Sequence, residues 1–135
     1  MKKYFVDTNI VLDLLADRKP FSGFAIELFH RAEQKKLKLF TSSHALATVY
    51  YLLKKSTDEK KLRKILLDLT DFLTILAVTE DNLKKGLRSA INDLEDALQI
   101  NCAGTVPELS GIITRNKKDF KGSDLPVFSP EEIKW

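Results

Sequence analysis

Residues 5–15 read FVDTNIVLDLL, and this stretch decides the fold. A short β-prone run from Lys3 to Val6 stops at a polar turn that begins with Asp7. Apolar residues then recur at helical spacing from Ile10 to Leu15. The order therefore predicts a strand, a polar turn and a helix.

The same alternation of strand and helix continues through the chain. The predicted strands cover residues 3–6, 37–41, 72–78, 112–114 and 125–128. The predicted helices run from residue 10 to Pro20, over 21–32, from Ser42 or Ser43 through 53, from a cap at Thr57 through 69, from a cap at Thr79 to 90, from Asp93 through 102, and over a short segment opened by Ser129. Such alternation favours a parallel sheet covered by helices on both faces, because each parallel crossover needs about a dozen residues. We expect one α/β domain over residues 1–135, three-layered (α/β/α), with a mostly parallel central sheet of four to five strands.

Composition excludes several classes of protein. The chain has 135 residues, 44% of them hydrophobic, which is enough for one packed core. The single cysteine, Cys102, excludes an internal disulfide and a thiolate zinc cluster. No apolar run approaches the roughly 18 residues that span a bilayer, and Asp7 and Asp13 interrupt any signal-peptide core. We therefore expect a cytoplasmic protein that does not enter a membrane.

Charge alone does not identify a partner. The net charge is +3, although ten Lys or Arg residues against three acidic residues lie between Arg31 and Lys64. A surface of this kind attracts phosphates, but the solvated faces of ordinary helices have the same composition.

Four aspartates are expected at one edge of the predicted sheet. Asp7 follows the first strand, Asp119 follows the strand at 112–114, and Asp93 and Asp96 begin the helix that leads toward that strand. Ligands of open parallel sheets bind beyond the carboxyl ends of the strands, and grouped carboxylates suit Mg²⁺ or Mn²⁺. Each acid also has a structural interpretation: Asp7 and Asp93 as helix N-caps, and Asp119 as the cap of a turn.

These residues carry a resemblance to a known family. The segments that carry it are FVDTNIVLDLL at 5–15, DLEDALQ at 93–99, IITRNKKDF at 112–120 and VFSPEEI at 127–133. In this order and spacing they resemble the PIN domain family, small metal-dependent nucleases that include the toxins of VapBC-type toxin–antitoxin pairs. The resemblance spans essentially the whole chain and implies a PIN-like fold.

The resemblance also implies an activity, partners and a site. It implies an endoribonuclease that hydrolyses RNA phosphodiester bonds with Mg²⁺ or Mn²⁺, an antitoxin protein as a partner, and a homodimer. Asp7, Asp96 and Asp119 match the catalytic and metal-binding acids of the family, and Asp93 is an accessory metal ligand. The polar residues that would support them are Thr8, Asn9, Thr48, Thr114 and Asn116.

One departure from the family pattern concerns the helix after the second strand. The family carries a Glu six residues beyond a Ser near the start of this helix, and Thr48 stands there. Because Thr48 supplies no charge, the site would hold metal more weakly, and a degenerate PIN domain that binds RNA or a protein without cutting is the alternative. A response-regulator-like or small-ligand α/β protein also carries acids at this edge, but the TRNKKDF segment argues against it.

Three further features have competing interpretations. Arg115 is predicted either to contact phosphate or to pair with Asp96 or Asp119. His44 lacks a second His or Cys that would make it a ligand. The aromatic stripe from Phe21 to Phe29 is predicted to pack in the core or to form a subunit interface.

Overall fold

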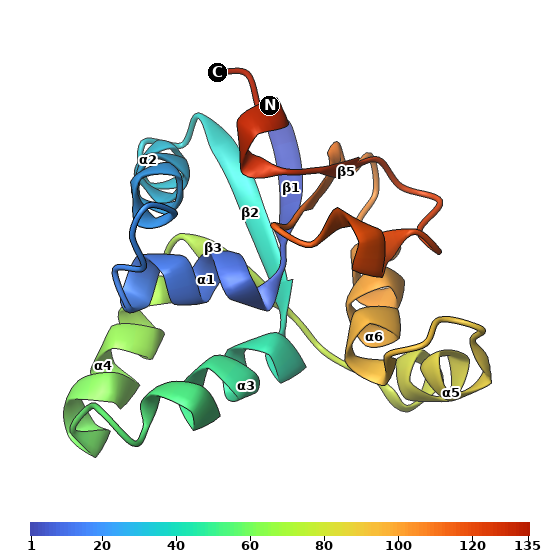
Figure 1. The fold of residues 1–135 in the computed structure, drawn as a ribbon, viewed down its shortest axis with the longest axis horizontal. Helices are drawn as coiled ribbons and strands as arrows, with labels where there is room; N and C mark the ends of the chain where they lie inside the picture. The colour runs from blue at the N-terminus through green and yellow to red at the C-terminus, as the bar shows by residue number, and fades with distance from the viewer.

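The computed structural model describes all of residues 1–135 (Figure 1). The elements in chain order are β1 (Lys2–Val6), α1 (Thr8–Leu15), α2 (Ser22–Glu33), β2 (Leu37–Ser42), α3 (Ser43–Leu53), α4 (Glu59–Leu69), β3 (Leu73–Leu76), α5 (Glu80–Arg88), α6 (Leu94–Ala103), β4 (Gly111–Ile113), the 3₁₀ turn η1 (Lys117–Phe120), β5 (Val127–Phe128) and the 3₁₀ turn η2 (Pro130–Glu132). The predicted alternation of strands and helices is confirmed.

The sheet has five strands in the order β3-β2-β1-β4-β5, and every neighbouring pair is parallel. The chain leaves β1 toward β2 on one side and returns to β4 on the other. The strand order therefore reverses between β1 and β4, and loops diverge there to leave a crevice at the carboxyl ends. Whatever follows β1 and β4 in the sequence lies at this crevice.

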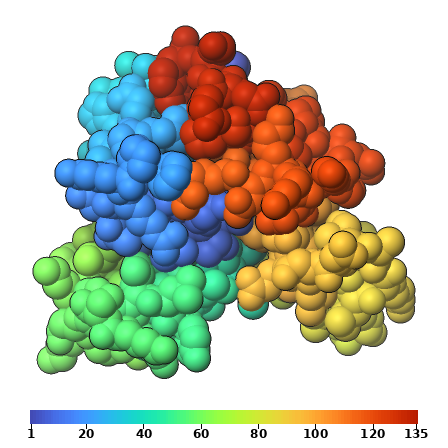
Figure 2. Space-filling view, in the orientation of Figure 1, coloured from blue at the N-terminus to red at the C-terminus, as the bar shows by residue number.

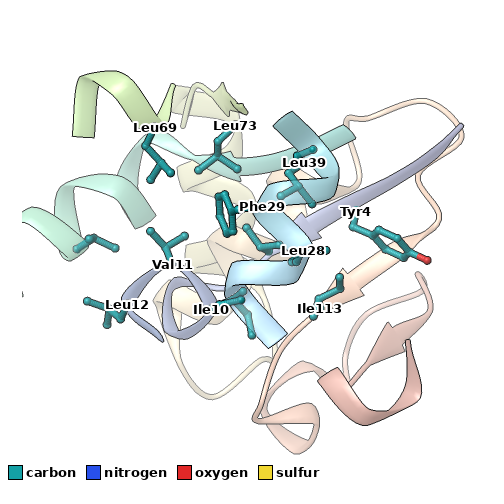
Figure 3. Packing of buried hydrophobic residues seen from close by; sticks show 14 of the residues in the cluster. Tyr4, Ile10, Val11, Leu12, Leu28, Phe29, Leu39, Leu69, Leu73 and Ile113 are labelled. Atoms are coloured by element: carbon teal, nitrogen blue, oxygen red, sulfur yellow. The ribbon is translucent and has the colours of Figure 1, made fainter. Parts of the chain in front are cut away.

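Each face of the sheet has its own hydrophobic core, because alternate residues of a strand point to opposite faces. Tyr4 and Val6 belong to a core with α1, α2, α3 and α4, and part of this core is shown in Figure 3. Phe5, between them, belongs to a second core with α6 and Phe120. The predicted three layers, α/β/α, are confirmed, and Cys102 is fully buried in the second core.

Several predicted helix ends differ from the observed ones. The first helix ends at Leu15 rather than at Pro20, and Asp17 two residues later adopts a left-handed backbone with φ 47°. The cap of α4 is Asp58, not Thr57, since the Asp58 carboxylate accepts a hydrogen bond from the Lys61 N–H at 3.1 Å. The predictions of Ser42 and Thr79 as caps are confirmed.

Two predicted strands are shorter in the structure. The strand expected over residues 72–78 covers only Leu73–Leu76. The last strand begins at Val127 rather than at Leu125, and Pro126, which has no N–H to donate, precedes it. No helix combines the length and the apolar character needed to cross a bilayer.

Candidate active site

Asp7 lies at the crevice between β1 and β4 and is held there by three hydrogen bonds. Its backbone N–H donates to the Ile113 carbonyl at 3.0 Å. Its carboxylate accepts from the Thr114 hydroxyl at 2.7 Å and from the Gln99 amide Nε2 at 3.0 Å. Asp7 occupies the cap position of α1 but makes no side-chain capping bond, so its carboxylate does not serve the helix.

Burial dominates the electrostatics of Asp7. The side chain is 7% exposed, and this desolvation raises its pKa above the usual value. The hydrogen bonds from Thr114 and Gln99 oppose the rise, and the charge of Asp119 adds to it. A positive charge placed beside Asp7 would relieve the penalty of burying this carboxylate.

Asp96 is the electrostatic centre of the acidic group. It lies in the first turn of α6. Desolvation and then the charges of Asp93, Asp7, Asp119 and Glu95, in that order, raise its pKa to about 7. Mutual repulsion of this kind requires that the carboxylates lie near one another. The structure therefore brings the four predicted aspartates into one electrostatic group.

A cleft of about 510 Å³ opens beside these acids. Asp93, Asp96 and Asp119 line it, together with Lys118 and Lys121. The cleft thus presents carboxylates and ammonium groups side by side. On a larger scale, Figure 2 shows a broad hollow beneath the carboxyl ends of the strands, between the green residues of α3 and α4 and the yellow residues of α5.

The oxygen atoms at the carboxyl ends of β1 and β4, called the acidic rim below, suit a hard divalent cation. Mg²⁺ and Mn²⁺ prefer oxygen ligands, and the rim supplies carboxylates together with two buried amide oxygens that lack hydrogen-bond partners, Asn9 Oδ1 and Gln99 Oε1. Both Asp7 oxygens accept one hydrogen bond, which leaves each a lone pair for coordination. No three carboxylate, imidazole or thiol side chains converge tightly enough to form a ready-made metal site.

Comparison with known proteins identifies the family. A profile described as PIN domain matches residues 3–118 of the chain. The chain belongs to the PIN domain family. A curated relative, Ribonuclease VapC1 of Aquifex aeolicus (strain VF5), is 29% identical over 137 residues, which covers 98% of this chain and 93% of the relative.

Solved structures of similar proteins agree with this assignment. A toxin–antitoxin complex from Klebsiella pneumoniae contains a chain with a TM-score of 0.68 and 28% identity, and the match covers 96% of this chain and 99% of that one. VapBC-1 from nontypeable Haemophilus influenzae gives a TM-score of 0.68 at 17% identity, with 96% and 99% coverage. The predicted PIN-like fold is confirmed.

The remaining site residues of this PIN domain surround the acids in different ways. Asp93 caps α6, because its Oδ1 accepts the Asp96 N–H at 3.1 Å, as its structural interpretation predicted. Thr114 links two residues, since its hydroxyl donates to Asp7 and accepts the Asn116 N–H at 3.0 Å. Thr8 is the first residue of α1 and is half-buried.

Arg115 departs from its prediction. Its Nε and Nη2 donate to the two carboxylate oxygens of Asp13 at 2.7 and 3.0 Å, so it pairs with neither Asp96 nor Asp119. Asp13 is 1% exposed, and this buried charge requires a partner. The guanidinium also lies 3.9 Å from the centre of the Phe21 ring. Arg115 therefore joins α1 to the segment after β4.

Thr48 lies on the face of α3 that turns toward α6. Its hydroxyl donates to the His44 carbonyl one turn earlier, at 3.0 Å. His44 Nε2 lies 3.4 Å from the Glu95 carboxylate, an electrostatic contact rather than a well-formed hydrogen bond. Position 48 therefore shares a helix face with His44, which contacts the residue before Asp96.

Sequence reasoning missed three features of this site. Gln99 lies three residues after Asp96, a spacing that places both on one helix face and was the available signal. Asp13, a lone charge within the apolar VLDLL run, was a candidate for burial, but the sequence did not indicate its partner. Lys118 and Lys121, inside NKKDFKG, had no signal beyond their proximity to Asp119.

Proposed function

We propose that this PIN domain is a divalent-metal-dependent endoribonuclease that hydrolyses RNA phosphodiester bonds, and that it is the toxin of a toxin–antitoxin pair. The observation that carries the proposal is the placement of Asp7 at the crevice between β1 and β4 and of Asp93, Asp96 and Asp119 around one cleft. The Aquifex relative named as a ribonuclease supports the activity. The Klebsiella neighbour, solved as a toxin–antitoxin complex, supports the biological role.

Mg²⁺ or Mn²⁺ is the proposed cofactor, held by Asp7, Asp96 and Asp119 with Asp93 as an accessory ligand. When bound, the cation supplies Lewis acidity toward the scissile phosphate and lowers the pKa of a water molecule. Thr114 and Gln99 fix the orientation of the Asp7 carboxylate.

The polar residues near the acids have supporting roles. Thr8 and Asn9 follow Asp7 on α1, and the buried Asn9 Oδ1 has no protein donor and is available to a water. Thr114 and Asn116 keep the segment after β4 against Asp7. Thr48 stands where a carboxylate would add a further ligand and orients water instead.

Lys118 and Lys121 are the proposed phosphate contacts of the cleft. Both line the same cavity as Asp119, and an ammonium group there attracts the RNA backbone to the carboxylates. Arg115, the phosphate contact predicted from the sequence, uses Nε and Nη2 to pair with Asp13. We propose that Arg115 positions the segment that follows β4.

An antitoxin protein and a second copy of the chain are the proposed protein partners. Solved neighbours are toxin–antitoxin complexes, which supports the first. Exposed apolar side chains on the α3–α4 arm, such as Tyr51 at 59% and Leu67 at 69% exposed, supply surface for either one.

RNA cleavage tests the proposal directly. Purified protein is incubated with a structured RNA pool in Mn²⁺, Mg²⁺ or EDTA, and products are resolved by length. We expect cutting in either metal, none in EDTA, and none with Asp7→Asn or Asp96→Asn. Asp71→Asn is the matched control, since this exposed carboxylate lies before β3 at the opposite end of the sheet. Equal products from wild type and both site variants would reject the assignment.

A binding module without catalysis is the second candidate. It is favoured by Thr48 at the position of a family acid and by the lack of a ready-made metal site. This candidate predicts that RNA remains intact in every metal while it still binds, and that Thr48→Glu creates cleavage.

A further inference from the structure

A small basic pocket lies at the amino ends of the strands, away from the acidic cleft. Lys2, Arg31, Lys36 and Lys134 line a cavity of about 130 Å³ together with Trp135, and no Asp or Glu side chain lines it. Lys2 begins β1 and Lys36 directly precedes β2. Four cations therefore converge on one concavity without an acid among the lining residues.

Three of these four cations have no acidic partner. Lys2, Lys36 and Lys134 are exposed and form no ion pair in the structure. Arg31 donates from Nε to Glu27 at 2.8 Å, and its Nη groups make no hydrogen bond with the protein. Like charges at close range are unfavourable unless an anion separates them, so this pocket is suited to a phosphate group.

Aromatic packing holds the pocket in place. The Trp135 ring stacks on Phe24 with centres 5.7 Å apart and planes 19° apart, and the Arg31 guanidinium lies 4.4 Å from the Trp135 ring centre. These contacts fix the C-terminal segment on α2, and Figure 1 shows both chain ends together at this end of the molecule. Trp135 and Arg31 are therefore positioned before any ligand arrives.

The basic pocket and Asp7 lie at opposite ends of β1. Lys2 and Asp7 are separated by the length of β1, about 17 Å at roughly 3.3 Å per residue. Phe21 at the start of α2 lies under Arg115, which follows β4, whereas Arg31 near the end of α2 lies at the pocket. At the 3.4 Å spacing of a fully stacked strand about five nucleotides cover this distance, and a more extended single strand needs fewer.

We propose that the basic pocket binds a backbone phosphate of the RNA substrate, about five nucleotides from the bond cleaved at the acidic rim. This inference rests on the proposed action on RNA and assigns that RNA a second contact. Its occupant is single-stranded RNA, because exposed lysines without acidic partners are what proteins place along the backbone of a single strand. The Trp135 ring packs on Phe24 and Arg31 and holds the pocket in shape.

Salt-dependent binding tests the inference in EDTA, where cleavage is suppressed. A fluorescein-labelled single-stranded RNA of 12 nucleotides is titrated with protein, and anisotropy is measured across a range of NaCl concentrations. The variant combines Lys2→Gln, Lys36→Gln and Lys134→Gln. The pocket holds one phosphate, and each phosphate contact to a single strand contributes about 0.7 to the slope of log affinity against log salt, so the variant is expected to reduce that slope by about 0.7.

A charge-matched control removes the effect of net charge. Lys55→Gln, Lys60→Gln and Lys61→Gln together remove three exposed lysines from the α3–α4 arm, so both triple variants lower the formal charge from +3 to 0. We expect the control to keep the wild-type slope. Equal slopes for the two triple variants, or no RNA binding by wild type, would overturn the inference.

Trp135 provides a direct optical readout, because it is the only tryptophan in the chain. RNA is expected to change its emission in wild type and in the control, and not in the pocket variant. Emission that depends on protein concentration and not on RNA would assign the pocket to contact between copies and overturn the inference. The same would follow if inorganic phosphate changed the emission while RNA did not.

Failure of this inference and failure of the proposed function give different results. If the protein cleaves RNA in Mn²⁺ and both triple variants bind RNA identically, only the inference about the basic pocket is rejected. A reduced slope for the pocket variant without cleavage by any form of the protein removes the ribonuclease and leaves the phosphate site.

Discussion

Replacement of Arg115 by Met is expected to destabilise the fold strongly. Arg115 makes a bidentate hydrogen-bonded pair with Asp13, which is 1% exposed. Met keeps much of the apolar stem but removes the charge and leaves the Asp13 carboxylate buried without a partner. Breaking one side of a buried pair in this way costs about 3–5 kcal/mol. Loss of the contact with the Phe21 ring adds about 0.5–1 kcal/mol.

The expected loss converts into a measurable change in melting temperature. For 135 residues the entropy of unfolding near the midpoint is about 0.28 kcal/mol per kelvin, so a loss of 3–5 kcal/mol lowers Tm by about 10–18 °C. Chemical denaturation followed by circular dichroism gives the free energy of unfolding independently.

A double variant separates the buried charge from lost packing. Asp13→Asn combined with Arg115→Met removes the uncompensated carboxylate, so the double variant is expected to be more stable than Arg115→Met alone by about 2 kcal/mol or more. A loss below about 1 kcal/mol for Arg115→Met, with no recovery in the double variant, would refute the assignment of Arg115 to Asp13. It would instead favour Arg115 as a residue free to contact phosphate.

Three further predictions concern the acidic rim. Gln99→Leu removes a hydrogen-bond donor from the buried Asp7 carboxylate. It should lower the free energy of unfolding in denaturant titrations by about 1–3 kcal/mol and weaken Mn²⁺ binding measured by calorimetry. An unchanged Mn²⁺ affinity would contradict this. The pKa of Asp96 is raised to about 7 in the folded state, so the folded protein binds more protons than the unfolded chain between about pH 4 and 7. The contribution of Asp96 to stability in EDTA therefore decreases as pH rises through that window. Asp96→Asn should flatten the dependence of Tm on pH. Thr48→Glu should lower the Mn²⁺ concentration needed for half-maximal cleavage, whereas Ala47→Glu on the neighbouring exposed face should not, and equal effects would place position 48 away from the metal.

The grouping of the acids could be predicted because it follows from topology. Once residues 5–15 indicate strand, turn and helix, Asp7 must lie at the carboxyl end of its strand, and parallel strands put Asp119 at the same edge. Hydrophobic periodicity placed α6 well enough to bring Asp96 to that edge. The order of the strands and helices, and the parallel direction of the strands, could therefore be predicted without knowledge of side-chain contacts.

Side-chain partners were the part that the sequence could not determine. Arg115 was predicted either to contact phosphate or to pair with Asp96 or Asp119. In the structure it pairs with Asp13, because this buried carboxylate needs a positively charged partner. Whether Asp13 is buried depends on how α1 packs on its neighbours, and no periodicity reports this. The cap at Asp58 instead of Thr57 is a similar case, because both residues are good caps and one residue of helix phase decides between them.

The aromatic stripe on α2 shows how one pattern divides between two roles. Leu28 and Phe29 are buried in the core as predicted, whereas Phe21 is 42% exposed under Arg115 and Phe24 stacks on Trp135. Phe21 thus contacts Arg115, which follows β4, and Phe24 contacts Trp135 in the basic pocket. In the proposed complex with RNA, the carboxylates and the basic pocket are two contacts at opposite ends of β1. Cleavage position would then be set by distance along the strand as well as by base identity, and substrates shorter than about five nucleotides on that side of the cut should be cleaved poorly.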